Sequence, residues 1–101
     1  MRRIVYAPSF DREVEDIAVY IEEQFGERVR REFIADLATL CQNVASFPGI
    51  GLAHHGYPIA CLAVAFRKNW VFFDYNDEKV EFLHIVDASR HKSNIDFSGD
   101  Q

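Results

Sequence analysis

Two hydrophobic stripes of helical period, joined almost without a linker, constrain the fold of this 101-residue chain more than any other feature. In residues 10–25 and 29–44, apolar side chains recur at helical spacing, which predicts two amphipathic helices. Ser9 is expected to cap the first helix, Gly26 to end it, and Pro48 to stop the second. Because only a residue or two separates the stripes, the helices must fold back on each other as a hairpin.

The rest of the chain has the composition and period of β-strands. Residues 49–56 contain three glycines and two histidines, which predicts a loop. We expect strands at residues 4–6, 59–66, 70–75 and 80–86. The expected order is β-α-α-β-β-β, so the fold class is α+β: a helical hairpin on a small, mainly antiparallel, curved sheet.

Length and composition indicate a single domain over residues 1–97, followed by a flexible tail at 98–101. No apolar run has the ~20 residues that a membrane-spanning helix needs, and no signal peptide is recognisable. Cys41 and Cys61 lie inside expected elements without the spacing of a disulfide framework. We therefore expect a cytoplasmic protein with two reduced, buried cysteines and no membrane partner.

The order of these weak signals resembles the ParE/RelE superfamily of bacterial toxins over residues 4–92. Residues 6–51 are similar to the family's first strand and its helical hairpin, which ends here in Phe47-Pro48-Gly49. Residues 70–92 are similar to its closing β-hairpin, which ends in an arginine, here Arg90. Membership implies a type II toxin–antitoxin (plasmid stabilisation) system, in which a cognate antitoxin neutralises the toxin and sets the oligomeric state.

RelE-like members of the superfamily are ribosome-dependent mRNA endoribonucleases. Their chemistry needs a group that activates the 2′-hydroxyl and cations that stabilise the phosphate. The candidates here are Arg67, His84, Arg90 and His91. His84 alternates with Val80, Phe82 and Val86, with Glu81, Leu83 and Ile85 on the opposite face, so we favour a partly buried strand histidine with a hydrogen-bond partner.

ParE-like members inhibit DNA gyrase by protein–protein contact and need no cationic cradle for a phosphate. The net charge of −5 and the few basic residues between 59 and 86 favour this branch over mRNA cleavage on the ribosome. Whether the chain is an enzyme is left open. The residues expected to bind the target are Arg67 and the cluster Arg90, His91 and Lys92.

Two further interpretations complete the prediction. The adjacent histidines His54 and His55 lack the spacing of a metal site, so no metal and no cofactor is expected. A protein of another functional class also fits the pattern, namely an inactive toxin relic that only binds its antitoxin. Growth arrest upon induced expression separates an active toxin from such a relic.

Overall fold

The computed structural model describes residues 1–53 and 61–88 and forms an α+β fold of two helices on a five-stranded sheet. The elements are β1 (Arg3–Tyr6), α1 (Pro8–Phe25), α2 (Glu27–Ser46), the 3₁₀ turn η1 (Pro48–Ile50), β2 (Leu52–Ala53), β3 (Leu62–Phe66), β4 (Asn69–Tyr75) and β5 (Lys79–Asp87). This order confirms the expected fold class and adds one strand, β2, inside the segment predicted to be a loop.

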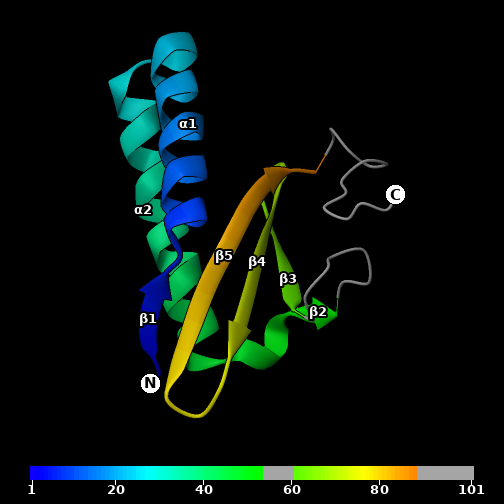
Figure 1. The fold of residues 1–101 in the computed structure, drawn as a ribbon. Helices are drawn as coiled ribbons and strands as arrows, with labels where there is room; N and C mark the ends of the chain where they lie inside the picture. Colours follow the sequence, from blue (N-terminus) through cyan, green and yellow to red (C-terminus); the bar gives the residue numbers. More distant parts are fainter. Residues whose placement is uncertain (54–60, 89–101) are drawn as a thin grey trace, which may run out of the picture.

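The sheet has the strand order β1-β5-β4-β3-β2. β1 lies parallel to β5, and every other neighbouring pair is antiparallel. Figure 1 shows the hairpin of α1 and α2 along one side of the sheet, with its tip continuing past the upper end of β5. The helices therefore cover one face of the sheet and leave a step where they outrun the strands.

The junction of the two helices is where the sequence places it. Gly26 has a φ of 97°, a value that L side chains rarely adopt, and its N–H donates to the Glu22 carbonyl at 2.9 Å. The predicted cap at Ser9 is wrong, because α1 begins at Pro8 and Ala7, two residues earlier, holds the cap position. The Ser9 hydroxyl donates instead to the Leu83 carbonyl of β5 at 2.7 Å.

A register shift in the β4–β5 ladder corrects the predicted faces of the last strand. Phe72 pairs with His84 and Phe73 pairs with Phe82, so Leu83 is an extra residue on β5. Consequently Phe82 and Ile85 both enter the core beneath the helices, whereas strict alternation separates them. Val86 packs on the other face with Leu83.

Two apolar clusters lie on opposite faces of the sheet. The larger joins both helices to the sheet and contains Phe10, Phe33, Leu37, Cys41, Val44, Ala45, Phe66, Val71, Phe73, Val80, Phe82 and Ile85. The smaller contains Cys61, Ala63 and Phe72, with Trp70, Leu83 and Val86 packed against it. Both cysteines are buried and free, as predicted.

Gly51 attaches the segment between α2 and β2 to the sheet. An added Cβ there would lie 2.5 Å from Cζ of Phe73, a ring that is itself fully buried. The backbone therefore approaches the ring more closely than any other residue type allows. This contact positions η1 and β2 beside β3.

We expect Gly51→Ala to lower the free energy of unfolding by about 1–3 kcal/mol, because the methyl group overpacks the Phe73 ring. Urea unfolding at constant pH measures this difference. Gly49→Ala is the matched control, since nothing lies within 4 Å of its added Cβ. Equal stabilities of the two variants would contradict the tight contact.

Burial also predicts a pH dependence of stability. It raises the pKa of Cys41 to about 12 and that of Cys61 to about 11. Since the folded state disfavours both thiolates, unfolding should become easier as the pH rises from ~8.5, where unfolded thiols ionise, through 11–12. Below that range the two thiols should contribute no pH dependence.

Urea midpoints between pH 8 and 11 test this expectation against a Cys41→Ala, Cys61→Ala double variant. Cys41 helps to raise the pKa of Tyr6, so both proteins carry Tyr6→Phe, and the difference between the two pH profiles then reports the thiols. Parallel profiles would contradict it.

Candidate functional site: a groove between the helical hairpin and the sheet

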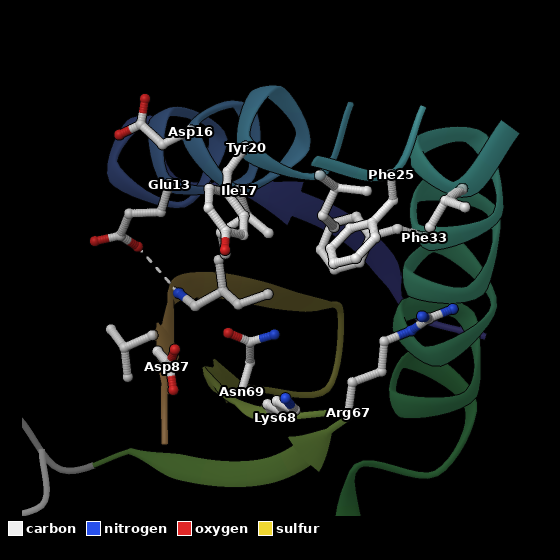
Figure 2. A pocket seen from close by; sticks show the side chains of 14 residues that line it. Glu13, Asp16, Ile17, Tyr20, Phe25, Phe33, Arg67, Lys68, Asn69 and Asp87 are labelled. Atoms are coloured by element: carbon white, nitrogen blue, oxygen red, sulfur yellow. Dashed lines mark hydrogen bonds between the residues drawn. The ribbon is translucent and has the colours of Figure 1, made fainter. Parts of the chain in front are cut away.

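A groove of about 1000 Å³ runs along the step where the hairpin outreaches the sheet. α1 forms one wall, the β3–β4 turn and the end of β5 form the other, and the start of α2 closes one end (Figure 2). The lining residues are Glu13, Asp16, Ile17, Tyr20, Ile21, Phe25, Val29, Phe33, Arg67, Lys68, Asn69, Ile85, Val86 and Asp87.

The floor and the α1 wall of the groove are mainly apolar. Ile17 and Ile21 are half-buried against the core, and Figure 2 shows Ile17 and Tyr20 directed into the groove. Tyr20 is 58% exposed and Phe25 64% exposed, so two large aromatic side chains remain in solvent beside it. Exposed apolar surface of this kind marks interaction sites in soluble proteins.

Side chains of α1 form hydrogen bonds with backbone groups on the edge of β5 that faces the groove. β1 pairs with β5 only as far as Phe82, so the later residues of β5 have no strand on that side. The carboxylate of Glu13 accepts the Ile85 N–H at 3.0 Å, shown as the dashed line in Figure 2. The Ser9 hydroxyl donates to the Leu83 carbonyl on the same edge.

His84 is held by the same carboxylate. Its Nδ1 lies 3.0 Å from Glu13 Oε2, and both side chains are about one-third exposed. The prediction of a partly buried strand histidine with a hydrogen-bond partner is confirmed. Glu13 is therefore shared between a ring nitrogen and a backbone N–H, which ties α1 to the bulged part of β5.

Arg67 occupies the turn between β3 and β4 in a strained conformation. Its φ is 56°, which is uncommon for a residue other than glycine. The guanidinium pairs with Asp36 of α2 and lies over the rings of Phe33 and Phe66, 5.8 and 5.6 Å from their centroids. Arg67 thus links the turn to α2 and sets the position of the groove wall.

Lys68, the next residue, connects the turn to the end of β5. Its carbonyl accepts the Ala88 N–H at 2.8 Å, so the chain leaves β5 beside the turn. Its side chain is exposed at the rim of the groove. The predicted cluster Arg90, His91 and Lys92 follows this point but lies outside the described residues.

The sheet face that turns away from the helices carries no cationic cluster in the described part of the chain. Cys61, Ala63 and Phe72 are buried there, with Trp70, Leu83 and Val86 around them. Along β2–β5 as described, the basic residues are Arg67, Lys68 and Lys79, and Lys79 begins β5 at the end opposite to the turn.

Comparison with known proteins agrees with this architecture. Residues 4–91 match the family described as the ParE toxin of the type II toxin–antitoxin system parDE. The chain belongs to the ParE toxin family. A search of curated proteins found no significant match.

A solved toxin–antitoxin structure gives the same fold for this ParE family member. A chain of the chromosomal ParDE toxin–antitoxin system from P. aeruginosa superposes with a TM-score of 0.71 at 10% identity, over 86% of this chain and 96% of that one. A chain of the E. coli DinJ–YafQ toxin–antitoxin complex gives 0.46 at 16% identity, over 87% and 93%.

Some of the remaining sequence predictions for this ParE family member concern described residues, and others concern residues outside them. No cluster of three potential metal ligands occurs within residues 1–53 and 61–88, and His54 and His55 lie outside them. No helix in the described ranges is long and apolar enough to span a bilayer. Of the predicted site residues, Arg67 lines the groove. His84 contacts Glu13, which also lines the groove.

Sequence reasoning missed the groove of this ParE family member. By sequence, Glu13 and Asp16 belong to the solvated acidic face of the predicted first helix, and Tyr20 lies off its apolar stripe. One usable signal exists, since Tyr20 is a large aromatic residue among acidic neighbours on a predicted helix. Whether Tyr20 lines a groove, however, depends on how far the helical hairpin extends past the sheet.

Proposed function

We propose that this chain is the toxin of a type II toxin–antitoxin pair that stabilises a plasmid, is neutralised by a cognate antitoxin and arrests growth by inhibiting DNA gyrase in the cytoplasm. Inhibition acts through protein–protein contact. The target-binding residues in this proposal are Arg67, Arg90, His91 and Lys92. Family membership supports the toxin class, and the character of the sheet supports the mechanism.

The observation that carries the mechanism is the apolar outer face of the sheet. Cleavage of RNA requires several cations around one phosphate, and each missing electrostatic contact raises the barrier by ~3–4 kcal/mol. In the described part of that face, Phe72 is fully buried among apolar neighbours. Arg67 is already paired with Asp36, and His84 with Glu13.

A second candidate function is ribosome-dependent cleavage of mRNA. The bond between the Ala88 N–H and the Lys68 carbonyl favours it, because it brings the end of β5 beside the turn that holds Arg67 and Lys68. Arg67, His84, Arg90 and His91 are the catalytic residues of this alternative.

Induced expression separates the two functions. We expect growth arrest with intact messages by primer extension, together with trapped gyrase–DNA complexes, and relief when the antitoxin is co-expressed. Arg90→Ala should abolish arrest, because loss of a charged contact with a protein partner costs ~2–5 kcal/mol. Early cuts at defined codon positions would instead establish mRNA cleavage, and absence of arrest would identify a relic.

We further propose that the antitoxin occupies the groove beside α1. The groove is a concave surface of about 1000 Å³ among the described residues, and exposed Tyr20 and Phe25 line it. A disordered antitoxin segment that folds on binding typically buries on the order of 1,000–3,000 Å², which requires an apolar surface of this kind. Arg67 lines this groove and is also one of the proposed target-binding residues, so an antitoxin bound there would cover part of the target-binding site.

Tyr20→Asp should weaken antitoxin binding about thirtyfold, because aromatic anchors at interface centres contribute roughly 2 kcal/mol or more. Isothermal titration with the product of the neighbouring gene measures the effect. Val19→Asp is the matched control: Val19 is the adjacent residue, is 42% exposed and does not line the groove. Equal affinities of the two variants would move the antitoxin site elsewhere.

A further inference from the structure

We propose that Asp36 of α2 is a positioning residue for Arg67: it holds the guanidinium in one place and leaves part of it open to an acceptor oxygen of the protein target. The inference rests on the proposed function, in which Arg67 is one of the target-binding residues. It adds to that function a residue that acts on the target only through Arg67.

The backbone at Arg67 indicates that its side chain has a use beyond the turn itself. β3 and β4 are joined by a two-residue turn, Arg67 and Lys68, between the paired residues Phe66 and Asn69. The favoured turns of this length need a positive φ at their first residue, so glycine or asparagine usually stands there. Arg67 has a φ of 56°, and in the described ranges it is the one residue other than glycine with a positive value. Strain of this kind lowers stability and clusters at functional sites, which directs attention to the guanidinium.

The guanidinium is held from two elements of the fold. Its Nη2 donates to Oδ2 of Asp36 on α2. Its central carbon lies 5.8 Å from the ring centroid of Phe33 on α2 and 5.6 Å from that of Phe66 on β3, and both rings are buried. Phe33 and Asp36 are three residues apart and therefore share one side of the helix. The rings thus form an apolar support, and Asp36 fixes the direction in which the N–H groups point.

Part of the guanidinium stays open after this pairing. An arginine has five N–H donors, and Asp36 accepts from Nη2. Among the described residues, no second group accepts a hydrogen bond from the Arg67 side chain, which is 43% exposed. The Asp36 carboxylate neutralises the charge, and Asp87 lines the same wall of the groove. The open edge therefore suits an acceptor oxygen of a protein better than a phosphate.

The pair of Asp36 and Arg67 matters for geometry more than for stability. Both members are exposed, and exposed ion pairs contribute little to folding. A long side chain that becomes immobilised in an interface, however, loses conformational entropy, and this loss weakens binding. Because Asp36 already restricts Arg67 in the free protein, less of this entropy remains to be lost when the target binds. Removal of the Asp36 carboxylate should therefore lower target affinity and leave the fold intact.

Supercoiling of relaxed plasmid by DNA gyrase, measured with increasing amounts of the full chain, tests the inference. Asp36→Asn should raise the concentration that halves supercoiling about fivefold, which corresponds to ~1 kcal/mol of binding free energy. Glu32→Gln is the matched control: Glu32 lies one turn earlier on α2, is exposed, pairs with Arg28 at 2.7 Å and loses the same charge. It should inhibit like the wild type. Asp36→Glu keeps the carboxylate and should restore most of the inhibition.

Two further measurements separate positioning from a purely structural role. In an Arg67→Ala background, Asp36→Asn should cause no additional loss of inhibition, because Asp36 acts only through Arg67. The Nε–H resonance of Arg67 should report an ordered side chain in the wild type and in Glu32→Gln, and a mobile one in Asp36→Asn. Urea unfolding should give equal stabilities for Asp36→Asn and Glu32→Gln. Additive losses in the double variant, an unchanged Nε–H resonance, or a loss of inhibition that follows a loss of stability overturns the proposal.

Failure of the inference is distinguishable from failure of the proposed function. If the wild type inhibits supercoiling and Asp36→Asn inhibits as strongly as Glu32→Gln, gyrase inhibition stands and the positioning role of Asp36 falls. If the wild type leaves supercoiling unchanged, the gyrase mechanism falls, and the target contact of Arg67 falls with it.

Discussion

β5 is longer than the strand beside it, and the way its unpaired edge is closed determines the shape of the molecule. β1 ends at Tyr6, opposite Phe82, and the chain turns at once into α1. The backbone groups of β5 beyond that point would be left without partners, which is costly where water is excluded. Ser9 and Glu13, one turn apart on α1, supply the missing partners. The first turns of α1 are thereby fixed to the sheet, while the tip of the hairpin projects beyond it and forms the groove.

The bulge at Leu83 is the second feature on which the site depends. It keeps Phe82 and Ile85 in one core, beneath the helices, and sends Leu83 and Val86 to the other face. Without the extra residue, the end of β5 would present the opposite set of side chains to α1. The apolar outer face, which argues for action by contact rather than by RNA cleavage, is a consequence of this shift.

This arrangement determines which charged side chains are paired within the fold and which are exposed to solvent. The overall charge of −5 and the acidic surface of α1 are compatible with a protein target and unfavourable for broad contact with nucleic acid. The described cations at the turn end of the sheet differ in role. Arg67 is part of the scaffold through Asp36 and two aromatic rings, whereas the neighbouring Lys68 faces solvent at the rim.

The sequence by itself determined the elements that depend on neighbouring residues. Helical and alternating periods, the glycine at the junction and the proline after α2 are local signals, so the hairpin, the strands from β3 to β5 and the fold class were predictable. The tertiary structure alone decided the cap of α1, the bulge, the short strand β2 and the groove. Ser9 shows the reason: its hydroxyl has a local use as a cap and a distant one at Leu83, and only the packed sheet makes the distant carbonyl available. Likewise, Glu13 and Asp16 look equivalent on a helical wheel, but β5 binds Glu13, whereas Asp16 is exposed at the rim, where its charge is available to a partner.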